Sequence, residues 1–181
     1  IDTRTALQAY EMARGLKNVK IVGIDCHIGS QISAAEPFAD AIENITALAK
    51  ELANLGIEIS YLDMGGGLGI TYNSESPPEP NEYASAIQKM LKTSAYKLIL
   101  EPGRVIVGNA GILVTSVLYR KQAPDKTFVI TDAAMNDLIR PSLYQAYHAI
   151  QPVVQKADAL ITADVVGPIC ESGDFLATDR E

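Results

Sequence analysis

Apolar residues recur at helical spacing in three stretches of the chain. The clearest stretch begins at Pro37 and ends before Gly56, and its apolar positions fall three or four residues apart throughout. Proline in the first turn and glycine after the last turn are typical helix boundaries. The apolar positions of a third, later helix are Tyr83, Ile87 and Leu91. The spacing also predicts a helix over residues 3–16, with Asp2 as its N-cap.

Short apolar runs lie between these helices. Residues 20–24, 57–62 and 97–101 are typical of buried strands, and the strand ends near residues 26, 63 and 101 are almost evenly spaced. Each interval holds one loop, one helix and one strand. Such regular alternation predicts a parallel sheet with right-handed crossovers. Because ligands of such sheets bind at the carboxyl ends of the strands, we expect a functional site there.

The pattern changes after Arg104. Residues 105–120 are rich in β-branched side chains and are interrupted by glycine. Further short strands are predicted at residues 127–131 and 160–166, with a helix near residues 143–150 between them. This later part of the chain is therefore predicted to be mainly β.

Composition indicates a folded, acidic protein. Hydrophobic residues make up 48% of the chain, which is ample for a packed core and excludes a mainly disordered state. Lys and Arg total 15 against 22 Asp and Glu, a net charge of −7, which argues against nucleic-acid or anionic-membrane partners. No apolar run is long enough to span a bilayer, so we expect a cytoplasmic protein. The two cysteines, Cys26 and Cys170, form no paired metal-ligand motif, and no metal site is predicted.

Three consecutive glycines, Gly65, Gly66 and Gly67, follow the second predicted strand. Such a backbone can approach a ligand closely and turn its N–H groups toward a phosphate. A tight turn between strand and helix would need glycine just as well. The run matches neither the dinucleotide-binding fingerprint, because Ile70 stands at the third glycine position, nor a nucleotide phosphate loop.

Other chemically distinctive residues also follow predicted strands. Glu101 ends an apolar strand, where its carboxylate needs a cationic or hydrogen-bonding partner, and an ion pair with Arg104 would be one solution. His27 stands at the end of the first strand with Ser30 close by, although a strand-end histidine is often only structural. The thiol of Cys170 suits either a proton donor or a small buried side chain.

Four motifs together carry a family resemblance. They are His27-Ile-Gly-Ser-Gln31, Leu62-Asp-Met-Gly-Gly-Gly67, Glu101-Pro-Gly-Arg104 and Cys170-Glu-Ser-Gly-Asp174. In this order they resemble the pyridoxal-phosphate-dependent decarboxylases of the alanine-racemase-like barrel fold. The resemblance covers essentially the whole chain. It implies an α/β fold, with the C-terminal part of a TIM-type (β/α)8 barrel in residues 1–109 and the start of a mainly β domain in residues 110–181.

The resemblance implies a role for each matching residue. His27 would lie against the ring of a pyridoxal 5'-phosphate cofactor, Glu101 would keep the pyridine nitrogen protonated, and Cys170 would return a proton to the substrate Cα. The residues matching those around the phosphate are Ser30, Gly65, Gly66, Gly67, Gly103 and Arg104. The residues matching those that bind the amino-acid substrate are Arg104, Arg140 and Tyr144 for its carboxylates and Glu171 for its distal ammonium.

Glu171 bears on the choice of substrate. Within the family, Glu after the cysteine is typical of members that convert meso-2,6-diaminopimelate to L-lysine, whereas ornithine and arginine decarboxylases usually carry Asp. A decarboxylase of that second type and an amino-acid racemase on the same fold are the enzymatic alternatives. A pyridoxal-phosphate carrier module is the non-enzymatic one, and a cysteine hydrolase pairing Cys170 with His27 or His148 is a further rival. His148 itself is expected to be a structural or surface histidine.

The resemblance also concerns assembly and completeness. In the family the cysteine motif reaches the partner subunit's site, which implies a head-to-tail homodimer with shared active sites. The lysine that binds the cofactor covalently precedes every motif found here, and no lysine of this chain matches it. The lysines expected to lie away from the site are Lys17, Lys20, Lys50, Lys89, Lys92, Lys97, Lys121, Lys126 and Lys156. We therefore expect a fragment of about half the enzyme, without turnover of its own.

Overall fold

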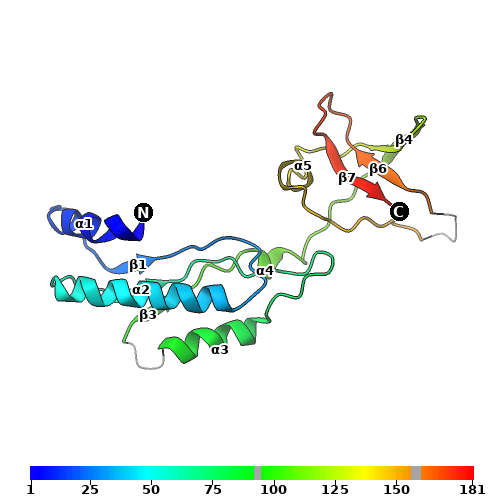
Figure 1. The fold of residues 1–181 in the computed structure, drawn as a ribbon. Helices are drawn as coiled ribbons and strands as arrows, with labels where there is room; N and C mark the ends of the chain where they lie inside the picture. The colour runs from blue at the N-terminus through cyan, green and yellow to red at the C-terminus, as the bar shows by residue number, and fades with distance from the viewer. Residues whose placement is uncertain (92–94, 156–159) are drawn as a thin grey trace. The chain divides into compact units, whose positions relative to one another are not determined.

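The computed structural model describes residues 1–91, 95–155 and 160–181 (Figure 1). The chain divides into two compact units. The first unit comprises residues 1–71 and 75–111, and the second comprises residues 72–74 and 112–181. Within the described ranges, no helix is both long and apolar enough to cross a membrane.

The first unit is built on three parallel strands. They are β1 (Gly23–Asp25), β2 (Tyr61–Asp63) and β3 (Lys97–Ile99), in the spatial order β1-β2-β3. The helices are α1 (Thr3–Arg14), α2 (Glu36–Asn54), α3 (Pro80–Leu91) and the short α4 (Arg104–Val107). Asp25 pairs with Asp63, and Asp63 with Ile99, so the three strands end in register. Side chains that follow these ends therefore meet at one edge of the sheet.

Helix α2 supplies much of the core of the first unit. Phe38, Ile42 and Leu52 on its inner face are almost completely buried, and burial of each side chain contributes about 1.5–3 kcal/mol. The Phe38 ring meets Tyr83 of α3 edge-on, with ring centroids 4.7 Å apart. Gly56 follows the helix in the left-handed conformation, at φ 72°, which ends it.

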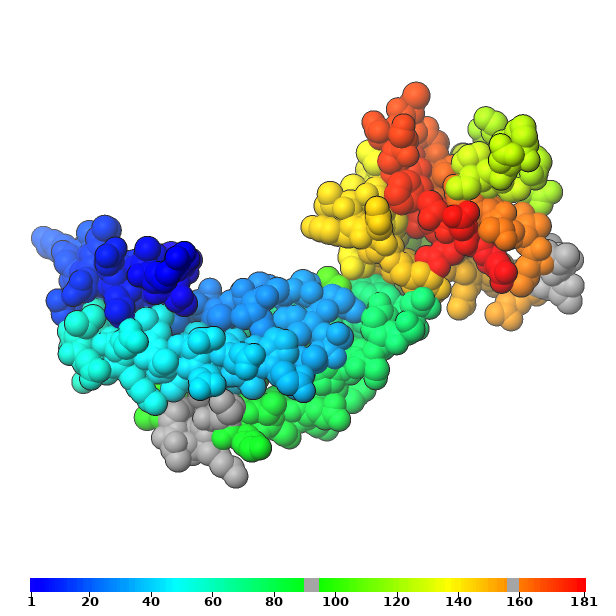
Figure 2. Space-filling view, in the orientation of Figure 1, coloured from blue at the N-terminus to red at the C-terminus, as the bar shows by residue number. Residues whose placement is uncertain are grey.

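Helix α1 packs against α2 (Figure 2). Its N-cap is Asp2, whose side chain accepts a hydrogen bond from the N–H of Arg4. The hydroxyl of Tyr10 donates to the carbonyl of Gly23 at 2.9 Å, which ties the helix to the start of β1. These contacts fix the strand that leads to His27.

The second unit contains a mixed four-stranded sheet. Its strands are β4 (Val117–Gln122), β5 (Thr127–Thr131), β6 (Ala163–Val166) and β7 (Phe175–Arg180), and its helix is α5 (Arg140–Tyr144). The spatial order is β4-β5-β6-β7, with β5 and β6 parallel and the outer pairs antiparallel. Every residue of the edge strand β4 is exposed.

The three helices and three strands predicted for the first unit are confirmed, and β5 spans the predicted residues. The helix predicted near residues 143–150 is wrong, because α5 ends at Tyr144 and the next residue, Gln145, takes the left-handed conformation at φ 52°. Residues 105–120 are not all β, since they begin within α4. Strand β7 was not predicted. Two neighbouring residues of that strand, Leu176 and Ala177, are both buried, and the β6–β7 register shifts twice, so the usual alternation is lost.

Candidate cofactor and substrate site

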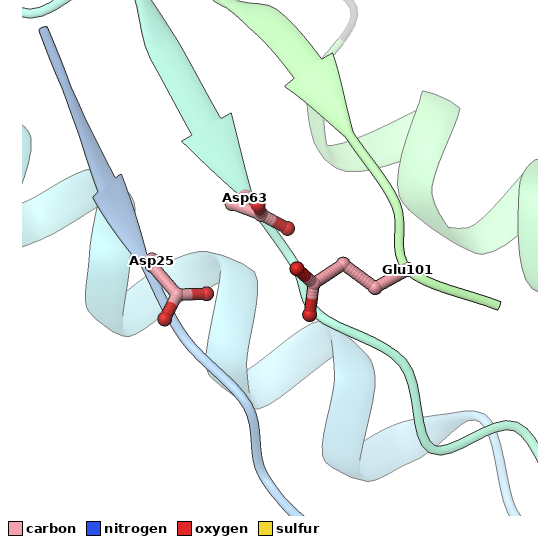
Figure 3. Close-up of side chains that lie close together, drawn as sticks. All are labelled: Asp25, Asp63 and Glu101. Atoms are coloured by element: carbon pink, nitrogen blue, oxygen red, sulfur yellow. The ribbon is translucent and has the colours of Figure 1, made fainter. Parts of the chain in front are cut away.

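Three acidic side chains lie together at the carboxyl ends of the parallel strands (Figure 3). Asp25 and Asp63 end β1 and β2, and Glu101 follows β3 by two residues. One carboxylate oxygen from each lies within 4.8 Å of the others. Because like charges this close repel one another, the group suits a positively charged partner. The separation would also fit a metal ion, although exposed acidic groups commonly lie this close without one.

The glycine turn lies directly beside Glu101. The N–H of Glu101 donates to the carbonyl of Gly65 at 2.8 Å, and the N–H of Met64 donates to the carbonyl of Ile99 at 3.1 Å. These bonds continue the β2–β3 pairing beyond the strands. The structure thus places the carboxylate and the triple glycine at the same edge of the sheet, as strand topology led us to expect.

Close backbone packing explains why three glycines stand here. Gly65 and Gly67 adopt positive φ angles of 62° and 105°, which side chains rarely tolerate. A Cβ added to Gly66 would overlap the carbonyl oxygen of Glu101, and one added to Gly67 would overlap that of Gly29. The turn therefore requires glycine at each position whether or not it binds a phosphate.

Two side chains hold the amides of this turn. The N–H of Gly65 donates to Asp63 Oδ1 at 2.9 Å, and the N–H of Gly66 donates to His27 Nδ1 at 3.2 Å. A phosphate would therefore depend on other donors while these two bonds persist. No role was predicted for Asp63, although an aspartate side chain commonly accepts a hydrogen bond from the backbone N–H two residues further on and so stabilises a turn.

Arg104 brings a positive charge to the same edge. It is the first residue of α4, after the N-cap Gly103, and its guanidinium donates to Ser30 Oγ at 2.8 Å and to Gln31 Oε1 at 3.0 Å. The Gln31 amide group also bonds both the N–H and the carbonyl of Ile70. A hydroxyl beside a guanidinium is a donor set suited to phosphate. Gln31, for which no role was predicted, fixes the guanidinium.

These residues fit the charge pattern of pyridoxal phosphate. Ser30 and Arg104 offer donors for an anionic group, while Glu101 stands in a carboxylate cluster suited to a protonated ring nitrogen. An apolar cavity of about 320 Å³ also borders the glycine turn. Its lining includes Leu68 and Tyr83 and, within the described residues, no charged side chain, so this cavity does not match the charge pattern of the cofactor.

The Cys-Glu-Ser-Gly-Asp motif forms a loop before β7, which we call the cysteine loop (residues 170–174). Cys170 and Glu171 are exposed, whereas Asp174 is only 4% exposed. The Asp174 carboxylate accepts hydrogen bonds from the N–H groups of Met135 and Ile169, both at 2.7 Å. Asp174 thus anchors the cysteine loop, whereas Cys170 and Glu171 remain exposed.

Helix α5 is bonded to the cysteine loop and to the start of β7. The hydroxyl of Ser142 lies 2.5 Å from the carbonyl oxygen of Gly173 and 3.2 Å from that of Phe175. Arg140 and Tyr144 are four residues apart, which places them on one side of the helix. Tyr144 is 68% exposed and Arg140 is half-buried. Three of the predicted substrate residues, Arg140, Tyr144 and Glu171, therefore belong to the second unit, whereas the fourth, Arg104, belongs to the first.

The predicted site residues fall into two groups, one in each unit. The first unit holds His27, Ser30, Gly65, Gly66, Gly67, Glu101, Gly103 and Arg104, and the second holds Arg140, Tyr144, Cys170 and Glu171. Among the lysines expected to lie away from the site, Lys97 begins β3, at the strand end opposite Glu101. Lys92 and Lys156 lie outside the described residues.

Comparison with known proteins identifies the family. The family model for the pyridoxal binding domain of pyridoxal-dependent decarboxylases matches residues 1–108. The chain is 52% identical to the diaminopimelate decarboxylase of Aquifex aeolicus and 54% identical to that of Neisseria meningitidis serogroup B, over 100% and 97% of its length. It covers 43% and 42% of those relatives.

A solved structure agrees with these matches. The diaminopimelate decarboxylase of Helicobacter pylori, crystallised with L-lysine, superposes with a TM-score of 0.88 and 40% identity, over 98% of this chain and 44% of that one. The predicted α/β fold of a barrel-type decarboxylase and the predicted pyridoxal phosphate cofactor are thereby confirmed. The chain belongs to the pyridoxal-dependent decarboxylase family, and residues 1–108 are part of its pyridoxal binding domain.

Proposed function

We propose that the protein to which this chain belongs decarboxylates meso-2,6-diaminopimelate to L-lysine with pyridoxal phosphate. The observation that carries this proposal is the arrangement of Glu101, the glycine turn and the Ser30–Arg104 pair at one edge of the parallel sheet. It supplies opposite charges for the two ends of the cofactor. The two relatives that are 52% and 54% identical to this chain are diaminopimelate decarboxylases, which supports diaminopimelate as the proposed substrate.

The residues of the first unit would hold the cofactor. Ser30 and Arg104 would bind its phosphate, His27 would lie against its ring, and Glu101 would keep a proton on the ring nitrogen. When bound, the protonated ring supplies an acceptor for the electron pair left behind as carbon dioxide departs. The Glu101 carboxylate supports this role because it sits beside Asp25 and Asp63, whose negative charges also favour a protonated nitrogen.

The residues of the second unit would act on the substrate. Cys170 would donate a proton from Sγ to Cα after decarboxylation. Arg140 and Tyr144 would bind substrate carboxylates, since a guanidinium pairs with a carboxylate through two parallel hydrogen bonds. Glu171, the neighbour of Cys170, would accept the distal ammonium. Its exposure leaves its carboxylate accessible for that contact.

We also propose a head-to-tail homodimer in which the cysteine loop of one subunit completes the site of the other. In the full-length protein, Glu101→Ala and Cys170→Ala variants would each be inactive. Mixing equal amounts with subunit exchange should restore roughly a quarter of the original activity, because half of the dimers contain one intact site of two. Absence of any recovery, with exchange verified by mass spectrometry, would contradict shared sites.

The decisive assay for the function is carbon dioxide release by the full-length protein from meso-diaminopimelate, ornithine and arginine. We expect diaminopimelate to be strongly preferred. A preference for ornithine would refute the role of Glu171. The 181-residue chain should release no carbon dioxide by itself, and borohydride treatment with pyridoxal phosphate should leave no single lysine stoichiometrically modified. A defined adduct would show that the chain carries the nucleophile after all.

A further inference from the structure

The guanidinium of Arg140 is held by two side chains that the proposed function does not use. Its Nη1 lies 3.0 Å from His148 Nε2, and its Cζ lies 4.7 Å from the centroid of the Tyr72 ring. The rings of Tyr72 and His148 also meet edge-on, with centroids 5.2 Å apart. All three residues belong to the second unit and are half-buried. Each member of this group therefore contacts the other two.

Donor chemistry fixes the state of the histidine. A guanidinium has five N–H donors and no acceptor, so the contact requires a lone pair on His148 Nε2. The ring is then neutral and carries its proton on Nδ1. His27 has the opposite arrangement, because its Nδ1 accepts the Gly66 N–H and its proton must lie on Nε2. The chain has only these two histidines.

The charge of Arg140 remains available to an anion. Within the described residues, its side-chain contacts are with a neutral imidazole and the face of a phenol ring, and no carboxylate forms a salt bridge with it. The hydrogen bond to His148 uses one donor of five, and stacking on Tyr72 uses the face of the group. Donors along the other edge of the guanidinium are left for a planar carboxylate.

We propose that Tyr72 and His148 are positioning residues that orient Arg140 to receive a substrate carboxylate. This inference rests on the proposed function, in which Arg140 binds the substrate. His148 sets the rotation of the guanidinium within its plane, and Tyr72 sets the plane itself. Neither side chain needs to touch the substrate or the cofactor.

The first test is independent of activity. Long-range proton–nitrogen correlation spectra of the full-length protein should show His148 protonated on Nδ1 and His27 protonated on Nε2. An Arg140→Ala variant should shift His148 toward the ordinary tautomer mixture and leave His27 unchanged, which makes His27 the internal control. Protonation of His148 on Nε2 in the unmodified chain would overturn the proposal.

The second test uses the full-length enzyme. His148→Leu removes the acceptor and should raise KM for diaminopimelate about ten- to 150-fold, the range for losing one hydrogen bond to a charged group, while kcat changes less than about threefold. His148→Gln supplies an acceptor oxygen at similar reach and should restore most of the loss. Tyr72→Phe should retain the KM, whereas Tyr72→Leu should raise it.

The two tests separate failure of the inference from failure of the function. If the unmodified full-length protein does not decarboxylate diaminopimelate, the proposed function fails, while the tautomer of His148 still decides whether it orients Arg140. If the enzyme is active but His148→Leu lowers kcat without raising KM, the positioning role is refuted. A loss of folded protein that His148→Gln does not correct would also count against it, since it would indicate a purely structural role.

Discussion

Asp174 offers the sharpest test of how the cysteine loop is held. Its carboxylate is almost fully buried and accepts backbone N–H bonds from Met135 and Ile169 at 2.7 Å. An Asp174→Ala variant would remove both acceptors and leave two N–H groups without partners. The loop would lose the contacts that join it to the segment after β5 and to the segment before Cys170.

The expected cost follows from the two bonds. A hydrogen bond to a charged group contributes about 1.5–3 kcal/mol, so Asp174→Ala should destabilise the second unit by about 3–6 kcal/mol. Asp174→Asn keeps one oxygen but turns an amide N–H toward a donor, so about half of that loss is expected. Asp125→Asn is the matched control, because this carboxylate lies exposed in the turn between β4 and β5. It should change stability by no more than about 0.5 kcal/mol.

Hydrogen exchange followed by mass spectrometry measures the effect locally. Peptides covering β6 and β7 should exchange about 100-fold faster or more in Asp174→Ala, since each 1.4 kcal/mol corresponds to a factor of ten. Peptides from α2, in the first unit, should be unchanged and serve as the internal reference. If β6 and β7 exchanged no faster in Asp174→Ala than in Asp125→Asn, the anchoring role of the carboxylate would be refuted.

Three further predictions concern other parts of the chain. Gly66→Ala should destabilise the first unit by about 1–3 kcal/mol in urea unfolding, because its Cβ would overlap a carbonyl oxygen; an unchanged midpoint would show that the turn can relax. Burial, and then the charge of its acidic neighbour, raise the pKa of Cys26, so iodoacetamide at pH 8 should label the exposed Cys170 first; equal labelling rates would contradict this. Hydrogen bonds from the Thr115 hydroxyl, and then from a backbone N–H, lower the pKa of Asp132. The ionised carboxylate therefore stabilises the fold above the ordinary carboxyl pKa of about 4, and this stability is lost as pH falls through the lower folded value. Thr115→Val should therefore lower stability most at neutral pH, and in acid the difference should narrow to the loss of the Ala133 N–H bond to the Thr115 hydroxyl; a constant difference at every pH would exclude the linkage.

Much of the first unit follows from local sequence signals. Pro37 and Gly56 bracket α2, because each residue has the backbone preference that its end of a helix needs. The alternation of strands and helices then fixes a parallel sheet, so Glu101 and the glycine turn could be placed at one edge before any coordinates. Such predictions succeed where backbone preference and hydrophobic period agree.

The fold of the second unit is harder to predict from the sequence. Helix α5 has five residues, too few for a hydrophobic period, and its end depends on the left-handed Gln145. Strand β7 pairs with β6 through shifted register, which hides the period of two. The side chains that hold the site were also missed, because contacts such as those of Gln31 and Ser142 join segments distant in sequence. Their geometry depends on how turns pack, not on any local pattern.

The structure also changes which residues support the prediction that a phosphate binds here. The triple glycine first suggested it, yet its backbone angles and close packing require glycine even in an empty site. Two of its amides are already bonded, to Asp63 and His27. Ser30 and Arg104 differ from the glycines, because no backbone angle requires a hydroxyl and a guanidinium to stand bonded to each other. Substitution of Arg104 should therefore weaken binding of pyridoxal phosphate in the full-length protein more than any change to the glycine turn that leaves the fold intact.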